Sequence, residues 1–230
     1  MLGHTAQDRA MTYSGSSRPP SDPPDWSDPR VPLVVLDLAS VETYLLVHLL
    51  SRTISEPGGA VWCPLESEAA ELDRDRARAE RQAAELDFSV KWPRAHWRPV
   101  PRAMRVAALA MARGCAEPYI RTMSRMAFAA AMDVNEVSAP IQLEHCRELD
   151  ESYYVAVDED LGLAGTEVTL ATQDSSEWDL RLKSVAAELA AIGITSAPAI
   201  RRDGEIRVGA SAILPLLAEL DACPPCRPLT

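Results

Sequence analysis

One small hydroxyl residue, Ser40, stands between an apolar run at residues 31–38 and an amphipathic segment that begins at Val41. If the run is a strand and the segment a helix, Ser40 lies at the helix N-terminus. Unpaired N–H groups and the positive end of the helix dipole stabilise an anion at such a place. Serine is also among the best N-cap residues. A chemical role and a capping role need the same geometry, so both stay open at this point.

Two other groups of residues could do chemistry, and we expect neither to do so. Cys223-Pro-Pro-Cys226 has the spacing of a redox or zinc signature. It follows the last predicted helix, starts none, and has no second pair to complete a four-ligand site. A disulfide in the tail or an intermolecular contact remains open for it. His145 and Cys146 are adjacent, and adjacent side chains on a helix diverge, so we expect no metal site.

The elements around Ser40 follow from the hydrophobic pattern. The unbroken apolar run at 31–38 is typical of a strand buried on both faces. A helix at Val41–Arg52, a turn at 56–60 and a strand at 60–65 complete a strand–helix–strand unit with a right-handed crossover. The mixed charges of residues 66–86 predict a helix with a solvated face.

The rest of the chain alternates between loop, helical block and sheet. We predict an ordered loop or pocket rim at 87–103, and helices over nearly all of 101–172. An amphipathic helix around 178–192 is followed by two strands, Ala199–Arg201 and Ile206–Val208. Asp203-Gly204 between these strands is a strong hairpin signal. A last helix at Ser211–Leu220 precedes the end of the chain.

This order predicts an α/β protein with a thioredoxin-like fold and an inserted all-helical domain. The thioredoxin-like domain would comprise residues 32–94 and 174–222, and the helical insertion residues 95–173. Residues 1–30, rich in Ser, Pro and Asp, read as a disordered tail, and residues 223–230 as a C-terminal tail. Redox proteins of this fold carry Cys-x-x-Cys at the start of the first helix. The window Ala39–Tyr44 holds no cysteine, which excludes thiol–disulfide chemistry there.

Composition limits the partners and the compartment. The 230 residues carry a formal charge of -11, which disfavours nucleic acid and anionic membrane surfaces. No apolar run reaches the roughly 18 residues that span a bilayer. The N-terminal residues lack the apolar region of a secretory signal, and the five cysteines have no regular spacing. We therefore expect a cytoplasmic protein with no membrane and no nucleic-acid partner.

Two segments resemble a known family. The stretch 36–45, LDLASVETYL, is similar to Phe-Asp-Phe-x-Ser-Pro-Tyr-Ser-Tyr-Leu, and the stretch 193–200, GITSAPAI, is similar to Gly-Val-x-Gly-Val-Pro-Thr-Phe. These are motifs of the DsbA-like superfamily, in the branch of 2-hydroxychromene-2-carboxylate isomerases and kappa-class glutathione transferases. The resemblance spans about residues 32–220 and places Pro198 at the family's cis-proline position. Two of the departures from the family concern the site: Val41-Glu42 replaces the family's Pro-Tyr, and Ser211 stands where the family has an Asp that contacts glutathione.

The resemblance implies a thiol-dependent isomerase or transferase that acts on a small unsaturated or carbonyl metabolite. Glutathione or another low-molecular-weight thiol would be the cofactor. Ser40 would be the catalytic residue, and Ala197, Pro198 and Ser211 would bind the cofactor. Three further residues are expected to line the substrate: Tyr44, His48 and Trp97.

The alternative is a noncatalytic member of the fold, because the charged thiol contacts of the family are missing. Such a protein would bind a peptide or metabolite, or would pair with an active subunit. For an enzyme we expect a small-molecule substrate, and a homodimer or pairing with a related subunit.

Overall fold

The computed structural model describes residues 28–53, 60–66, 76–93, 99–134, 168, 171 and 175–215. In this part of the chain, no helix has both the length and the apolar character that crossing a membrane requires. The prediction for Trp97 lies outside these residues, as do those for Cys223 and Cys226 and for both tails except 28–30.

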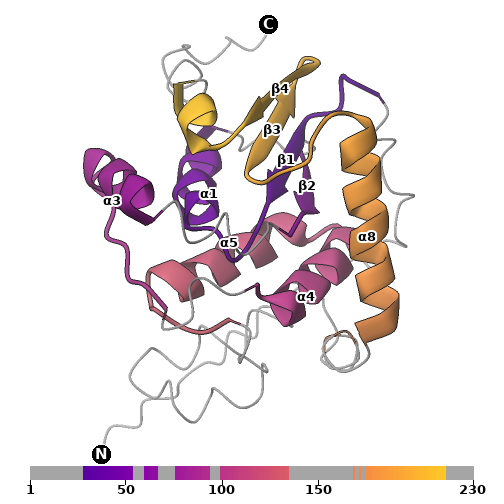
Figure 1. Cartoon of the computed structure of the whole chain (residues 1–230), viewed down its shortest axis with the longest axis horizontal. Helices are drawn as coiled ribbons and strands as arrows, with labels where there is room; N and C mark the ends of the chain where they lie inside the picture. The colour runs from indigo at the N-terminus through magenta and orange to yellow at the C-terminus, as the bar shows by residue number, and fades with distance from the viewer. Residues whose placement is uncertain are drawn as a thin grey trace, which may run out of the picture.

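A four-stranded mixed sheet forms the centre of the molecule (Figure 1). Its strands are β1 (Leu33–Leu36), β2 (Val61–Pro64), β3 (Ala199–Arg202) and β4 (Glu205–Val208), in the order β2-β1-β3-β4. β1 pairs parallel with β2 and antiparallel with β3, with Val35 opposite Ala199. β4 is antiparallel to β3. The end of β1, the start of β3 and the end of β4 therefore meet at one edge of the sheet.

β1 is buried on both faces, which confirms the interpretation of the apolar run. Leu33 and Val35 belong to a core with Val185 and Leu189, and Val34 and Leu36 belong to a second, larger core. Successive side chains of a strand point to opposite faces, so one short run supplies both cores.

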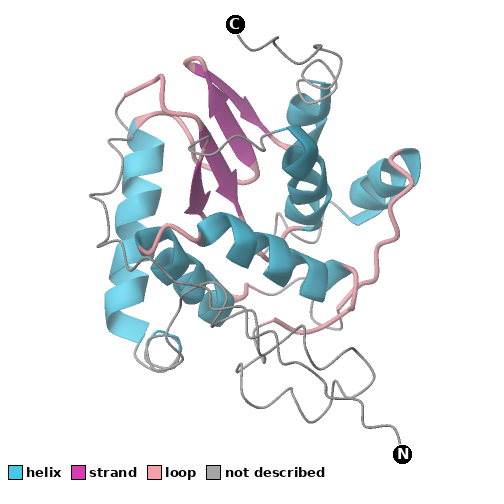
Figure 2. Ribbon diagram, turned by 180° about the vertical axis from the view of Figure 1, so that it is seen from behind, coloured by secondary structure: helices cyan, strands magenta, loops and turns pink. Residues whose placement is uncertain are grey.

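Helices cover both faces of the sheet. α1 (Val41–Thr53) lies on one side and α8 (Ser175–Ala191) on the other, as both views show (Figures 1 and 2). The short helical stretch 210–215 lies on the same side as α1. α3 (Arg76–Glu85) lies outside this arrangement and packs beside α1. Its buried residues are few and small or polar: Ala79, Gln82 and Ala83.

Two helices of the predicted insertion, α4 (Pro101–Ala112) and α5 (Ala116–Phe128), lie below the sheet in Figure 1. They pack against each other; α5 also packs against α1, and α4 against α8. Gly114, with a φ of 73°, ends α4 and allows the sharp turn into α5. Arg105 of α4 donates to Asp179 of α8 at 2.7 Å and ties the insertion to the sheet-covering helix.

The hairpin at Asp203-Gly204 is confirmed. Both residues have positive φ, 51° and 81°, as the tight turn between twisted antiparallel strands requires. The predicted first helix, second strand and amphipathic helix are also confirmed. The predicted start of the helical block at residue 101 is also confirmed: Pro101 starts α4, where a proline loses no helical hydrogen bond, and the predicted loop ends before it.

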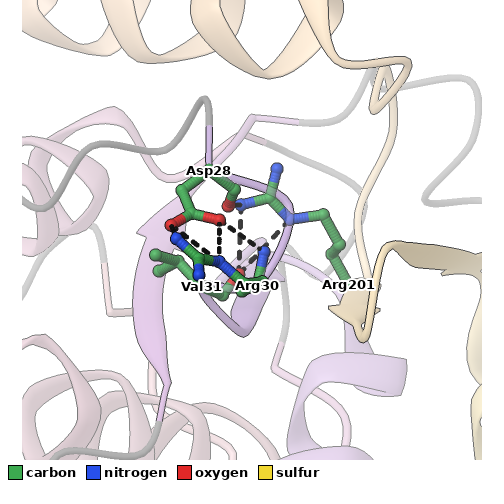
Figure 3. A network of polar contacts seen from close by, with 4 residues as sticks. All are labelled: Asp28, Arg30, Val31 and Arg201. Atoms are coloured by element: carbon green, nitrogen blue, oxygen red, sulfur yellow. Dashed lines mark hydrogen bonds and ion pairs between the residues drawn. The ribbon is translucent and has the colours of Figure 1, made fainter.

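Arg201 fastens the segment that leads into β1 (Figure 3). Its buried guanidinium donates to the carbonyl oxygens of Asp28 and Val31, each at 3.0 Å. Arg30 donates to the Asp28 carboxylate and holds the pKa of that group at about 2.

Candidate functional site

Ser40 is the N-terminal boundary residue of α1, as predicted. Its N–H donates to the Asp37 carbonyl, and its own carbonyl accepts the N–H of Thr43, both at 3.1 Å. The residue is half-buried. Among the described residues, no hydrogen bond involves the Ser40 hydroxyl. A hydroxyl at the positive end of a 13-residue helix is thus available to a ligand.

Two buried side chains fix the turn that presents Ser40. The Asp37 carboxylate accepts the N–H of Ala39 at 2.8 Å, and the Thr43 hydroxyl accepts the N–H of Asp37 at 3.2 Å. Asp37 and Thr43 are 2% and 0% exposed. Thr43 is the fourth residue of the window that begins at Ser40, so the second position of a redox pair holds a structural hydroxyl here.

A second turn lies at the same edge of the sheet. Pro198 directly precedes β3, and its carbonyl accepts the N–H of Gly209 at 2.7 Å. The Ala197–Pro198 peptide bond is cis. Because Ala199 lies opposite Val35, the start of β3 is beside the end of β1, which leads to Ser40. The structure thus brings Ser40, Ala197 and Pro198 to one edge.

Glu42 connects these two turns. Its side chain is only 4% exposed. Oε2 accepts the backbone N–H of Ala210 at 3.1 Å, and Oε1 accepts from the Arg78 guanidinium of α3. A buried carboxylate needs such partners, since an isolated charge is very unfavourable in the interior. The first turn of α1 therefore carries its own anion, bound to residues 36 and 168 positions away in sequence.

Gln82 extends the same polar cluster. Its amide nitrogen donates to the hydroxyl of the exposed Ser211 at 3.3 Å. Its amide oxygen is buried and has no hydrogen-bond partner within the described part of the chain. Arg78 and Gln82, four residues apart on α3, reach α1 and the turn after β4 respectively. The Arg78 side chain is 43% exposed, so it belongs to the predicted solvated face and also pairs with the buried Glu42.

The predicted lining residues Tyr44 and His48 belong to an aromatic cluster. Their rings meet edge to face at 4.8 Å between centroids, and His48 stacks on Phe88 at 5.4 Å. The Tyr44 hydroxyl donates to the Ser89 carbonyl at 3.3 Å, and burial raises the pKa of Tyr44. These contacts pack α1 against the segment after α3 and against Phe128 of α5. A substrate-lining role stays a prediction.

The two described cysteines, Cys63 and Cys115, are poor nucleophiles. Burial raises the pKa of Cys63 in β2 to about 12. Burial also raises the pKa of Cys115, which directly precedes α5. A thiol reacts as its thiolate, so neither supplies a nucleophile near neutral pH. Within the described ranges, no group of three or more His, Cys, Asp or Glu side chains could hold a metal ion.

A carboxyl group with a shifted pKa lies next to the turn before Ser40. Asp37 directly follows β1, Glu66 lies two residues after β2, and the two strands are parallel neighbours. Glu66 is exposed, but neighbouring protein atoms still take part of its carboxyl group out of water and raise its pKa; the negative charges of Asp37 and Asp179 raise it further. Arg105 opposes this shift. Glu66 therefore holds its proton to a higher pH than an ordinary glutamate.

No family model matches the chain, and no curated protein matches it. Solved structures do. 2-Hydroxychromene-2-carboxylate isomerase (HCCA isomerase) superposes with a TM-score of 0.60 at 13% identity, over 83% of this chain and 94% of that chain. A protein described as a probable DsbA oxidoreductase from Streptomyces coelicolor gives a TM-score of 0.54 at 15% identity, over 85% and 92%. The chain therefore has the DsbA-like thioredoxin fold that HCCA isomerase shares, which confirms the predicted fold class.

Proposed function

We propose that this protein is a thiol-dependent isomerase or transferase for a small unsaturated or carbonyl compound, with a low-molecular-weight thiol such as glutathione as cofactor. The observation that carries the proposal is the hydroxyl of Ser40. It stands at the N-terminus of α1, makes no hydrogen bond to the described residues, and lies at the edge that Ala197 and Pro198 share.

The chemistry uses the helix terminus as an anion site. The Ser40 hydroxyl and the first N–H groups of α1 stabilise the thiolate of the bound cofactor. The backbone of Ala197 pairs with the backbone of a thiol peptide. The thiolate adds to an unsaturated or carbonyl carbon and forms a C–S bond. After rotation about the bond left single, the C–S bond breaks and returns the thiolate, which is isomerisation by covalent catalysis.

A cofactor must supply the thiol, because the described cysteines of the protein do not supply a reactive one at Ser40. Ser40 replaces the reactive cysteine of redox proteins of this fold, and Thr43 replaces the second. Cys63 and Cys115 have raised pKa values, and neither belongs to the window Ala39–Tyr44. The likeness of the fold to an isomerase supports this reading of the site.

Calorimetric titration with glutathione and related thiols tests the proposal, using Ser40→Ala and the control Ser184→Ala. Ser184 is an exposed serine of α8 that contacts Glu188. We expect wild type and Ser184→Ala to bind a thiol, and Ser40→Ala to lose that binding while it remains folded. Because the Ser40 hydroxyl makes no capping hydrogen bond to the described residues, its removal alone should change the free energy of unfolding by less than about 1 kcal/mol. If no thiol binds the wild type, the proposal is wrong.

A second candidate is a noncatalytic binding or accessory protein that pairs with a peptide, a metabolite or a related subunit. Glu42 favours it, because a buried carboxylate in the first turn of α1 opposes a thiolate nearby. Under this alternative, Ser40→Ala lowers stability slightly and leaves binding of the partner intact.

A further inference from the structure

The first turn of α1 carries a negative charge close to Ser40. Glu42 lies two residues after Ser40, so the Cα atoms of the two residues are at most about 7 Å apart. The carboxylate is also bound to the turn after β4, where Oε2 accepts the N–H of Ala210 at 3.1 Å. The residue before Ala210 is Gly209, which donates its N–H to the Pro198 carbonyl at 2.7 Å. The charge of Glu42 therefore acts on both segments of the proposed thiol site.

An uncompensated carboxylate at this place would oppose the proposed reaction. The first turn of a helix stabilises an anion because its dipole is equivalent to roughly half a positive elementary charge. A full negative charge in the same turn outweighs that amount. Salt screens little over such a short range, since the Debye length is about 8 Å at physiological ionic strength. Unless Glu42 is neutralised, a thiolate at Ser40 meets a net negative potential.

Arg78 of α3 supplies this neutralisation. Its guanidinium donates to Oε1 of Glu42 and forms an ion pair with it. The Arg78 Nε atom is buried and the Glu42 side chain is 4% exposed, so water weakens this pair less than a pair in bulk solvent. α3 packs beside α1, and Gln82, one helical turn after Arg78, donates to Ser211. These contacts hold the cation against the first turn of α1.

We infer that Arg78 is a positioning residue of the proposed reaction: it acts through Glu42, whose charge it neutralises, and so keeps the start of α1 able to hold a thiolate at Ser40. The inference rests on the proposed function. It gives α3, which lies outside the sheet and its covering helices, a role at the site. It also answers the objection that a carboxylate in the first turn of α1 raises against a thiolate.

A thiol introduced by Ser40→Cys tests the inference without a cofactor. The pKa of this thiol reports how well the start of α1 stabilises a thiolate. It is obtained from the rate of alkylation at position 40 as a function of pH, and mass spectrometry of peptides separates this position from the other cysteines. The Ser40→Cys protein is compared with the same protein carrying Arg78→Met, Arg78→Lys, Glu42→Gln, or Glu42→Gln and Arg78→Met together. The buried Asp37 carboxylate, which also lies in this turn, is the same in all of them.

We expect Arg78→Met to raise the pKa of the introduced thiol by about one unit, a tenfold change in its acid dissociation constant. Glu42→Gln should lower the pKa by a similar amount, because the charge of Arg78 is then uncompensated. Arg78→Lys keeps the charge and the double variant removes both charges, so each should leave the pKa nearly unchanged. A merely structural role of Arg78 does not produce this order, since Glu42→Gln lowers the pKa although it also removes a native contact.

Arg76→Met is the matched control, because it removes the same charge from α3 in an exposed pair with Glu80. It should leave the pKa of the introduced thiol unchanged. The inference is overturned if Arg78→Met raises this pKa no more than Arg76→Met does, or if Glu42→Gln does not lower it. If Arg78→Met does not fold, the result for Glu42→Gln alone decides.

Titration of the unaltered protein with thiols decides the proposed function separately. If no thiol binds but the expected order of pKa values is found, the proposed function fails and the effect of Arg78 on the start of α1 stands. If a thiol binds and the pKa of the introduced thiol does not respond to Arg78 or Glu42, the proposed function stands and this inference is wrong.

Discussion

The ion pair between Glu42 and Arg78 is asymmetric, and this predicts which partner matters more for stability. The Glu42 side chain is 4% exposed, whereas the Arg78 side chain is 43% exposed. Removal of the arginine leaves a buried carboxylate whose other partner is the Ala210 N–H. Removal of the negative charge leaves a cation that water already reaches.

The expected magnitudes follow from this difference. Arg78→Met keeps most of the side-chain stem and should lower the free energy of unfolding by about 3 kcal/mol, near the lower end of the range for a broken buried pair. Glu42→Gln keeps the shape and an acceptor for Ala210, so it should cost about 1 kcal/mol. The double variant should be more stable than the sum of the single effects predicts, because neither charge is then left alone.

Urea unfolding of wild type, both single variants and the double variant measures these values as a cycle. Arg76→Met, on the same helix but in an exposed pair with Glu80, is the matched control and should change stability by less than about 1 kcal/mol. The reasoning is refuted if Arg78→Met lowers the free energy of unfolding no more than Arg76→Met does. It is also refuted if Glu42→Gln lowers it more than Arg78→Met does.

Three further outcomes are expected. Gly204→Ala should destabilise by about 1 kcal/mol in urea unfolding, because φ is 81° and the added Cβ meets only Pro29 at an ordinary 3.9 Å; an unchanged midpoint would contradict the hairpin geometry. Glu66→Gln should raise the melting temperature at pH 7 and leave it unchanged at pH 4. Because the pKa of Glu66 is raised in the folded state, the protein loses stability as pH rises above 4.5, the ordinary pKa of a glutamate. A higher melting temperature of Glu66→Gln at pH 4 alone would contradict this direction. Arg201→Met should lower stability by about 2 kcal/mol and speed amide exchange in the strand that follows Val31, since two carbonyl oxygens lose a charged donor; unchanged exchange would argue against the contact.

Much of the fold could be predicted because its signals are local. An apolar run buried on both faces, a serine before an amphipathic helix, and Asp203-Gly204 between two short strands each have a local physical cause. The start of α4 has such a signal too, since Pro101 suits the first position of a helix.

The polar cluster could not be predicted from the sequence, because its contacts join distant segments. Glu42 is visible in the sequence as a carboxylate in the first turn of a helix. Nothing local says that it is buried against Arg78 and Ala210. Gln82 lies in a charged helix, and its contact is to Ser211, 129 positions away in sequence.

The aromatic residues show the same limit. Tyr44 and His48 are one helical turn apart, which predicts that they share a face but not what that face meets. The structure places Phe88 and Phe128 there, and these come from a loop and from α5. Packing explains Tyr44 and His48 without a ligand, whereas the Ser40 hydroxyl has no such explanation among the described residues.

The central claim is that a thiol binds between the start of α1 and the turn at Pro198. Amide chemical shifts of the ¹⁵N-labelled protein, followed during titration with a thiol, test it most directly. The account predicts that the largest changes fall on Val41, Glu42 and Ala197 and vanish in Ser40→Ala. Changes confined to the Tyr44–His48 aromatic cluster, or none at all, would contradict it.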